Sequence, residues 1–574
     1  MMNLEQTIAK TFLQMAEGLE SGSFGVKPKI ALTGMGSEHG EKNAMEAALM
    51  AAKKGVDVYY IGTLEAEGVT TVKVNDEDEG HKKMEEMVES GEVDGAVTMH
   101  FPFPIGVSTV GKVVTPARGR EMFIATTTGT SSSDRIEGMI KNAIYGIITA
   151  KASGIADPTV GILNVDGARQ TEMALNQLKE GGYQFSWATS ARADGGAVLR
   201  GNDVLQGTPD VLVCDSLTGN VLIKMLSAYS TGGSFEATGY GYGPGIGKGY
   251  HKLIHIISRA SGAPLIANAL VYAADMVRGK VFEVADKEFA AAEKAGLDNI
   301  LAARKAAAKP AEAAEEVKAP PAEPCTASIP GIEVMDLEDA AKASGIADPT
   351  VGILNVDGAR QTEMALNQLK EGGYQFSWAT SARADGGAVL RGNDVLQGTP
   401  DVLVCDSLTG NVLIKMLSAY STGGSFEATG YGYGPGIGKG YHKLIHIISR
   451  ASGAPLIANA LVYAADMVRG KVFEVADKEF AAAEKAGLDK ILAARKAAAK
   501  PAEAAEEVKA PPAEPCTASI PGIEVMDLED AAKALWKEGI YAETGMGCTG
   551  PLVMMSEANK EKAAEILKKA GYIG

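Results

Sequence analysis

The chain carries a long segment of its own sequence twice. Residues 153–343 recur at 344–534, offset by 191 positions, and the two copies differ only at Asn299, which is Lys490 in the second. Solenoid repeats have periods of about 20 to 50 residues, whereas this unit is large enough to hold a hydrophobic core. Removing one unit from the 574 residues leaves an ancestral chain of 383, either duplicated recently or joined to itself in sequence assembly.

The repeat divides the chain into six segments. They are an N-terminal α/β half (1–152), a second α/β half in two copies (153–301 and 344–492), a linker with a truncated tail (302–343), a second linker (493–520) and a C-terminal tail (521–574). Both linkers are rich in Ala, Pro, Glu and Lys, a composition typical of spacers. Because one N-terminal half serves two copies of the second half, one copy lacks its partner or borrows it from another chain.

Short apolar segments alternate with helical ones throughout. Strands are predicted at 29–34, 93–101, 121–129, 159–166 and 209–215, and helices at 41–54, 135–152, 169–180 and from about Asn220 to Tyr229. Strands joined by crossover helices predict a parallel sheet covered on both faces. The predicted fold class is α/β, with a parallel sheet in two domains and the second half duplicated in tandem.

Charge and composition exclude several functions. With 55 Lys and Arg against 72 Asp and Glu, the net charge is −17, which argues against nucleic acid or an anionic membrane as a partner. No apolar run reaches the roughly 18 to 20 residues of a membrane span, and the N-terminus resembles an amphipathic helix more than a signal peptide. We therefore expect a cytoplasmic protein that binds small molecules or other proteins.

The segment 209–224, PDVLVCDSLTGNVLIK, resembles a phosphate site. A strand leads to a turn with Asp215 and Gly219, and a helix is predicted to open at Asn220 with Lys224 one turn further on. Free N–H groups at such a helix start attract phosphate. The second copy repeats these positions as Asp406, Gly410, Asn411 and Lys415. In the competing interpretation, Asp215 and Asn220 only cap the turn.

A glycine-rich stretch at 231–249, TGGSFEATGYGYGPGIGKG, follows this helix. Glycines allow positive φ angles and a close approach of the backbone to a ligand, although the stretch is equally compatible with a mobile lid. Arg259, repeated as Arg450, is a candidate clamp for an anion. An exposed arginine at the end of a strand can also be simply solvated.

Cys548 is the cysteine with the strongest functional pattern. It lies in GMGCTGP at 545–551 and occurs once, whereas the other four cysteines form repeated pairs. A thiol between glycines is accessible, and neighbouring N–H groups can lower its pKa and stabilise the oxyanion of a thioester. Cys214 and Cys405 are predicted to be core residues, and Cys325 and Cys516 to be inert. A buried Cys548 that packs as a small hydrophobic residue is the alternative.

Two histidines are candidate general bases. His39 and His100 both follow predicted parallel strands, at the sheet edge where ligands bind in open α/β folds. His251 and His255 have a spacing that could hold zinc on a helix, but no third ligand accompanies them. We therefore expect neither a metal nor a bound cofactor.

The motifs together resemble the alpha subunit of protein C of the glycine/sarcosine/betaine reductase complex. GILNVDGAR, RADGGAV, CDSLTGN, GYGPGIGKG, SRASGAP, IPGIEVMDLEDA, LWKEGIYAE and GMGCTGP occur in the expected order over the whole 383-residue unit. This family is similar to the phosphate acyltransferase of phospholipid synthesis and to phosphate acetyltransferase. The resemblance implies their two-domain fold, which isocitrate dehydrogenase shares, with the active cleft between the domains.

The resemblance also implies a reaction. A carboxymethyl selenoether on selenoprotein A becomes an acetyl thioester on protein C, and phosphate, the substrate, releases it as acetyl phosphate. Cys548 would carry the acetyl group, and the region of Asp215, Asn220 and Lys224 would place the phosphate. The beta subunit of protein C and selenoprotein A would be the partners, in a hetero-oligomer.

Two other functions remain open. The chain could be a non-catalytic scaffold for the beta subunit and selenoprotein A. It could instead be a free-standing phosphate acetyltransferase that uses coenzyme A. Against this third function, the Ser-Arg pair that phosphate acetyltransferases carry before an Asp is replaced by Asn268 and Ala269 ahead of Asp275.

Overall fold

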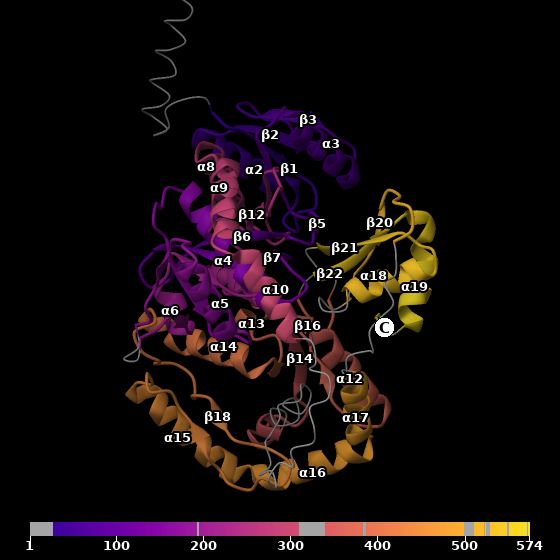
Figure 1. Ribbon diagram of the computed structural model, residues 1–574. Helices are drawn as coiled ribbons and strands as arrows, with labels where there is room; N and C mark the ends of the chain where they lie inside the picture. Colours follow the sequence, from indigo (N-terminus) through magenta and orange to yellow (C-terminus); the bar gives the residue numbers. More distant parts are fainter. Residues whose placement is uncertain are drawn as a thin grey trace, which may run out of the picture.

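The computed structural model describes residues 27–191, 195–308, 339–382, 386–498, 510–521, 523, 528–547, 550–570 and 572–573. We call residues 1–152 the N-terminal half, 153–343 copy 1, 344–534 copy 2 and 535–574 the tail. In Figure 1 the N-terminal half and copy 1 form one body, copy 2 lies beneath it, and the tail lies at one side. Among the described residues, no helix is both long enough and apolar enough to cross a membrane.

The N-terminal half contains seven strands and three described helices. In chain order they are β1 (Lys29–Thr33), α2 (Glu41–Lys53), β2 (Asp57–Gly62), β3 (Thr70–Lys73), α3 (Glu77–Ser90), β4 (Gly95–Thr98), β5 (Phe103–Pro104), β6 (Val107–Val114), β7 (Glu121–Thr130) and α4 (Arg135–Ala152). Side chains define where helices begin. The Asp134 carboxylate accepts the N–H of Glu137 and caps α4, as polar N-cap residues do.

Copy 1 continues the same alternation. Its elements are β8 (Thr159–Leu163), α5 (Ala168–Glu180), β9 (Ser186–Trp187), β10 (Val198–Leu199), α6 (Gly201–Gln206), β11 (Val211–Val213), α7 (Ser216–Ala228), β12 (Gly243–Ile246), β13 (Ile254–Ile256), α8 (Ala263–Arg278), α9 (Val281–Lys294) and α10 (Leu297–Ala308).

Copy 2 repeats this order and leads into the tail. Its elements are β14 (Thr350–Leu354), α12 (Ala359–Glu371), β15 (Ser377–Trp378), β16 (Val389–Leu390), α13 (Gly392–Gln397), β17 (Val402–Val404), α14 (Ser407–Ala419), β18 (Gly434–Pro435), β19 (His446–Ile447), α15 (Ala454–Arg469), α16 (Val472–Lys485) and α17 (Leu488–Ala498). Then follow β20 (Ala518–Pro521), α18 (Leu528–Lys537), β21 (Ala542–Gly547), β22 (Gly550–Met555) and α19 (Lys560–Lys569).

The N-terminal half and copy 1 share one large sheet. Its order is β10-β8-β11-β7-β6-β12-β13-β4-β1-β2-β3, and most neighbours are parallel, which confirms the predicted fold class. The sheet interleaves the two segments, because β6 and β7 lie between β11 and β12, and β13 pairs with β4. Position 152 is therefore the edge of the duplicated segment and not the edge of a folded unit.

Three elements differ from the sequence-based expectation. The segment at 107–114 forms β6, an antiparallel strand with no counterpart in the prediction. The glycine-rich stretch contains β12, a buried strand, where a ligand loop or a mobile lid was expected. Gly243 explains this, because its φ is +85° and a Cβ there would lie 1.8 Å from the carbonyl oxygen of Val110. The stretch ETGMGCTGP at 543–551 was expected to be a loop, but its first five residues belong to the strand β21.

Copy 1 and copy 2 face each other with nearly two-fold symmetry. Helix α6 packs on α14, and α13 packs on α7. The Gln206 side chain donates to the carbonyl of Gly424 at 2.8 Å, and the equivalent Gln397 donates to Gly233, also at 2.8 Å. Tyr229 meets its equivalent Tyr420 with 3.7 Å between ring centroids. Such self-complementary pairing is the geometry of a two-fold dimer, here within one chain.

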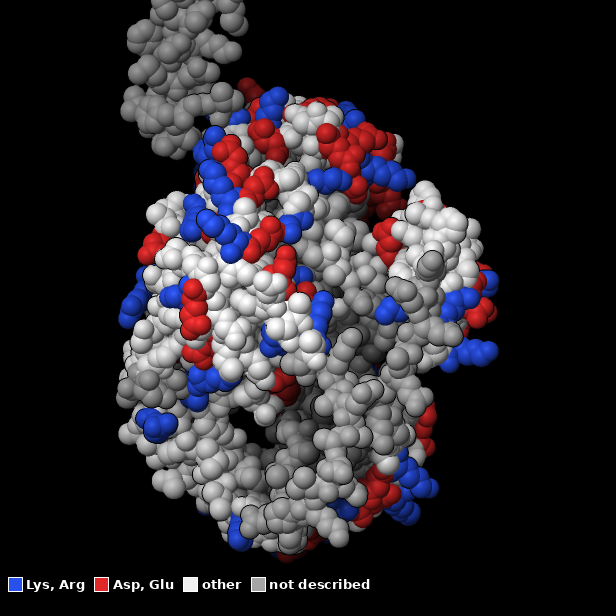
Figure 2. Space-filling view, in the orientation of Figure 1, with Lys and Arg blue, Asp and Glu red and all other residues white. Residues whose placement is uncertain are grey.

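The two copies differ in what covers them. In copy 1, α8 packs on α2 of the N-terminal half, and Leu270 is 0% exposed. The equivalent Leu461 on α15 is 69% exposed, and Val462 beside it is 55% exposed. Identical sequences thus have an apolar face that is buried in copy 1 and open in copy 2. On the face of the molecule in Figure 2, acidic and basic side chains are interspersed over the N-terminal half.

His255 makes the unfolding free energy of the chain depend on pH. It lies on β13, edge-on to Tyr272, is 0% exposed, and burial lowers the pKa of His255 from its usual 6.5 to about 3. Below pH 6.5 the unfolded chain binds a proton at this residue and the folded chain does not. The unfolding free energy therefore falls by about 1.4 kcal/mol per pH unit as pH drops from 6.5 towards 3.

We expect His255→Leu to flatten this part of the stability curve. Between pH 7 and pH 5, wild type should lose about 2 kcal/mol more unfolding free energy than the variant, as measured by urea titrations at both pH values. His446→Leu is the matched control, because the same residue in copy 2 is only partly covered. Equal slopes for wild type and His255→Leu would contradict the prediction.

Candidate functional site

A cavity of about 510 Å³ lies where the N-terminal half, copy 1 and copy 2 meet. The N-terminal half supplies Gly36, Ser37, Glu38 and Met99; copy 1 supplies Lys224, Gly233, Ser234, Tyr242, Ser258, Arg259 and Ala260; copy 2 supplies Ala382, Arg391, Asn393, Asp394 and Gln397. The wall is therefore built from regions far apart in the sequence. Ligand sites occur preferentially at such junctions.

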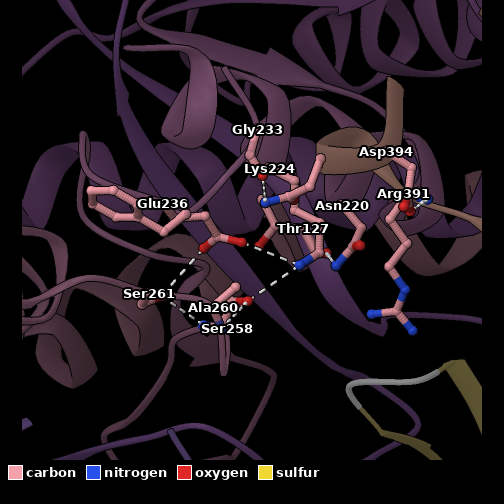
Figure 3. Close-up of polar contacts among 12 residues, drawn as sticks. Thr127, Asn220, Lys224, Gly233, Glu236, Ser258, Ala260, Ser261, Arg391 and Asp394 are labelled. Carbon is pink, nitrogen blue, oxygen red and sulfur yellow. Dashed lines mark hydrogen bonds and ion pairs between the residues drawn. The ribbon is translucent and has the colours of Figure 1, made fainter. Parts of the chain in front are cut away.

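Lys224 is the centre of a buried polar network at this cavity (Figure 3). Its ammonium group donates to Glu236 Oε1 and to Ser258 Oγ, both at 3.2 Å. Ser261 Oγ donates to the other oxygen of Glu236 at 3.2 Å. Burial opposes the charge of Lys224, but the attraction of Glu236 and the contact with Tyr242 together outweigh it, so the pKa of Lys224 stands above its usual value. Lys224 therefore remains charged at neutral pH.

Ser258 lines the cavity and belongs to this network. Its Oγ accepts from Lys224 and from the backbone N–H of Ala260, the latter at 3.1 Å. A serine oxygen has two lone pairs and one proton, so its proton is left for Tyr242, with which the Ser258 side chain also forms a hydrogen bond. An anion in the cavity would compete with Tyr242 for this donor. Neither Ser258 nor Glu236 was singled out from the sequence, although the SFEATG and SRASGAP segments contain them.

Arg259, the candidate anion clamp, lines the cavity, but its guanidinium is already paired. Its guanidinium bonds to Glu77 at 2.5 Å and donates to the carbonyl of Gly36 at 3.0 Å. Both partners belong to the N-terminal half. The side chain thus joins copy 1 to the N-terminal half, and an anion in the cavity would share it with Glu77.

The predicted phosphate loop has a different role from the one expected. Helix α7 begins at Ser216 and not at Asn220, because the Asp215 carboxylate accepts the N–H of Thr218 at 2.9 Å and caps it. Asp215 also pairs with Arg135 at 2.9 Å. These contacts occupy its carboxylate, and a negative group would repel phosphate, so the cap interpretation describes Asp215.

Gly219 and Asn220 fit α7 against the sheet. A Cβ at Gly219 would lie 1.7 Å from the carbonyl oxygen of Thr126 on β7, so only glycine permits this approach. The Asn220 side chain donates to the carbonyl of Thr127 at 3.1 Å. Both residues therefore set the position of α7, and Lys224 is the residue of this motif that reaches the cavity.

The two candidate histidines lie beside the cavity and not among its lining residues. His39 is exposed, and its Nε2 lies 3.2 Å from the carbonyl oxygen of Ala260. His100 follows Met99, packs edge-on to His81, and has its pKa lowered by burial and by the charges of His81 and Arg259. His100 is consequently neutral at pH 7, the form that a general base requires.

Copy 2 keeps the buried network but not the contacts around it. Lys415 donates to Glu427 at 3.1 Å and to Ser449 at 3.0 Å, as in copy 1. The equivalents of the N-terminal contacts are missing there because the chain has one N-terminal half. Asp406 still caps its helix, Gly410 has no strand packed on it, the Asn411 side-chain oxygen is buried without a partner in the described structure, and Arg450 is exposed.

The structure describes three of the cysteines, Cys214, Cys405 and Cys516. Cys214 is buried at the end of β11, which confirms a core role, and its equivalent Cys405 is partly buried. Burial and Glu543 raise the pKa of Cys516, which disfavours the thiolate. Cys325 and Cys548 lie outside the described residues.

The tail packs against the N-terminal half. Strand β21, which ends at Gly547, pairs antiparallel with β5, with Met546 in register with Phe103. Strand β5 begins four residues after Met99 of the cavity wall. The residues that precede Cys548 in sequence therefore contact the same segment that carries His100.

Comparisons with known proteins agree with the fold. A family model described as "Fatty acid synthesis protein" matches residues 28–345 and again 341–554, consistent with the tandem duplication. The glycine/sarcosine/betaine reductase complex component C subunit alpha of Peptoclostridium acidaminophilum is 54% identical over 344 residues, 60% of this chain and 89% of that protein.

More distant relatives are phosphate acyltransferases. That of Lysinibacillus sphaericus is 24% identical and that of Bacillus cytotoxicus 26%, each over 242 residues, 34% of this chain and 70% of the relative. A branched-chain phosphotransacylase from Enterococcus faecalis has a TM-score of 0.32 and 14% identity, covering 44% of this chain and 99% of its own. By the family model and the 54% identity, this chain belongs to the fatty acid synthesis protein family, among the relatives of the component C alpha subunit of glycine/sarcosine/betaine reductase.

Proposed function

We propose that this chain is the acyltransferase subunit of a glycine/sarcosine/betaine reductase complex, and that it transfers an acetyl group from a cysteine thioester to phosphate. The pairing of β21 with β5 carries the proposal. Cys548 follows Gly547 directly in sequence, so a thioester there would be tethered to the segment of the N-terminal half that borders the cavity. The family relationship supports the same chemistry, since its relatives include phosphate acyltransferases.

The cavity of copy 1 is the proposed phosphate site. Ser258 would turn its O–H from Tyr242 to the phosphate, and Arg259 would share with the phosphate a guanidinium that pairs with Glu77. Lys224 is a positioning residue in this proposal, because its charge is balanced by Glu236 and it holds Ser258 through a hydrogen bond. Hydrogen bonds to a charged phosphate are stronger than neutral ones, so few donors suffice.

The proposed step breaks one bond and forms one. A phosphate oxygen attacks the thioester carbonyl carbon, the C–S bond breaks, and the products are acetyl phosphate and the Cys548 thiolate. We propose that His100, which is neutral and follows Met99 of the cavity wall in sequence, accepts a proton from the attacking phosphate. We propose selenoprotein A as the source of the acetyl group and the beta subunit of protein C as the partner. No bound cofactor enters this scheme.

We expect an acetyl donor to protect Cys548 from alkylation. The full chain is treated with iodoacetamide with and without the acetylated partner, and the modified peptides are identified by mass spectrometry. Label should enter the Cys548 peptide first and be excluded by the donor. Cys516 is the control, because the raised pKa of its thiol makes it slower to react.

The two alternative functions are separated by further experiments. If the chain is a scaffold for the beta subunit and selenoprotein A, Cys548→Ser leaves the turnover of the assembled complex intact. If it is a free-standing enzyme that uses coenzyme A, the purified chain forms acetyl phosphate from acetyl coenzyme A without partners. Label spread equally over Cys325, Cys516 and Cys548 would contradict the thioester proposal.

A further inference from the structure

We propose that copy 2 completes the anion site of copy 1, and that Arg391 of copy 2 binds the phosphate there. This inference deepens the proposed function and rests on it. Arg391 was not a candidate from the sequence, because its role depends on packing between two copies that no pattern within one copy reveals.

Arg391 reaches the cavity from across the interface between the copies. Its side chain is 9% exposed and lines the same cavity as Lys224 and Arg259. In Figure 3 it extends away from Asp394, on the copy 2 side of the Lys224 network. The positive charge of Arg391 also acts on Lys224, where it opposes the raised pKa. Because Arg391 and Lys224 line one cavity, a ligand held there lies near both cations.

The surrounding contacts hold Arg391 in this position. The backbone N–H of Arg391 donates to Asp394 Oδ2 at 2.9 Å, and Asp394 also accepts from Ser381 Oγ at 3.0 Å. Gln397, one turn further on, donates to the carbonyl of Gly233 in copy 1. A Cβ at Gly392 would lie 2.6 Å from the carbonyl oxygen of Val221, so glycine permits the close approach of α13 to α7. Copy 1 and copy 2 therefore fix the start of α13 together.

The charges of the cavity favour an anion. Its lining carries three cationic side chains, Lys224, Arg259 and Arg391, and two carboxylates, Glu38 and Asp394. Asp394 is occupied by the hydrogen bonds to Ser381, Ala382 and Arg391. Lys224 and Arg259 are paired with Glu236 and Glu77, so an anion placed among the three cations would share two of them with these carboxylates, in a site where burial weakens the screening by water. A guanidinium matches a tetrahedral oxyanion with two parallel hydrogen bonds.

The two-fold symmetry supplies an internal control. Arg200 of copy 1 is the equivalent of Arg391 and occupies the N-cap position of α6, as Arg391 occupies that of α13. It faces the Lys415 network of copy 2, which lacks the wall formed by residues 36–38 and Met99. Substitutions at the two arginines should disturb the interface between the copies equally, and only the one at Arg391 should disturb a complete cavity.

The test is the binding of inorganic phosphate to the full chain by equilibrium dialysis. We expect Arg391→Gln to raise the dissociation constant for phosphate by about 10- to 100-fold, the loss of one charge-assisted contact. Arg200→Gln should leave the dissociation constant within about 2-fold of wild type. Arg391→Lys should recover part of the affinity, because it keeps the charge and loses the paired hydrogen bonds. Thermal unfolding checks that both glutamine variants remain folded to the same extent.

Equal shifts for Arg391→Gln and Arg200→Gln would overturn the inference, because the effect would then belong to the interface. Unchanged affinity in Arg391→Gln would overturn it as well, while leaving the proposed function intact. Absence of phosphate binding by wild type would overturn both. If phosphate binds as expected and no acetyl phosphate forms in the assembled complex, the proposed function fails and the anion site stands.

Discussion

Lys224→Met should abolish the formation of acetyl phosphate, whereas Lys415→Met should leave most of it. Both lysines have the same neighbours in sequence and the same buried partners, Glu236 in copy 1 and Glu427 in copy 2. They differ in that the N-terminal half covers only the cavity beside Lys224. Without Lys224, Ser258 loses a fixed orientation and the cavity loses a cation. Loss of one preorganised hydrogen-bond donor lowers the rate of the chemical step by about 10²- to 10³-fold.

Stability separates this effect from simple misfolding. Breaking a buried ion pair on one side leaves an uncompensated carboxylate and costs about 3 to 5 kcal/mol. Because the side chains of both pairs are almost fully buried, urea titrations should show losses of similar size for Lys224→Met and Lys415→Met. Their rates of acetyl phosphate formation in the assembled complex should differ all the same.

A double variant keeps the prediction testable if Lys224→Met unfolds. Lys224→Met combined with Glu236→Leu replaces the ion pair with apolar side chains, a change that is often neutral for stability. We expect this variant to be folded and inactive. A folded, active double variant, or equal loss of activity from Lys415→Met, would show that the Lys224 network does not serve the reaction.

Much of the fold could be predicted from the sequence, because alternating strands and helices leave a clear periodic signal. The helix at 135–152 has its predicted bounds, and the strand at 29–34 is only one residue shorter as β1. Strands β6 and β12 were missed, since threonine and glycine weaken the apolar pattern there. The start of α7 was misplaced because a helix start at Asn220 was assumed for the phosphate site, whereas in the structure Asp215 caps the helix, as the competing interpretation held.

The candidate site was less predictable for a physical reason. Lys224 and Arg259 could be selected because single motifs contain them, and both line the cavity. Glu236 and Ser258 were missed, since their roles depend on contacts between elements rather than on spacing within one. Arg391 is the extreme case, because its position follows from the packing of one copy on the other.

Deletion of residues 344–534 should convert the chain into a two-fold dimer. The 383-residue product retains the N-terminal half, copy 1 and the tail, and α6 and α7 of one molecule can pack on α7 and α6 of another as α14 and α13 do here. Each repeat would then have its own N-terminal half. The apolar face that Leu461 and Val462 expose in copy 2 has no equivalent in this dimer, because Leu270 is covered.

Light scattering after gel filtration measures the expected change. The deletion variant should have twice the mass of its chain, whereas the full chain should bind more of a hydrophobic dye through the open face of copy 2. Tyr229→Asp is the control, because Tyr229 meets its equivalent at the two-fold interface, where two carboxylates would repel each other. A deletion variant that is monomeric and fully active would contradict the dimer.

In the deletion dimer, Arg200 should take over the phosphate-binding role that we propose for Arg391 in the full chain. Arg200 of one molecule would occupy the place that Arg391 occupies in the full chain, at the start of a helix facing the Lys224 network of its partner. Arg200→Gln should therefore weaken phosphate binding by about 10- to 100-fold in the dimer, although it is nearly silent in the full chain. If Arg200→Gln leaves the dissociation constant for phosphate unchanged in both proteins, copy 2 does not act as a partner subunit within the chain. The reason is that Arg200 and Arg391 differ only in whether they lie at a complete cavity.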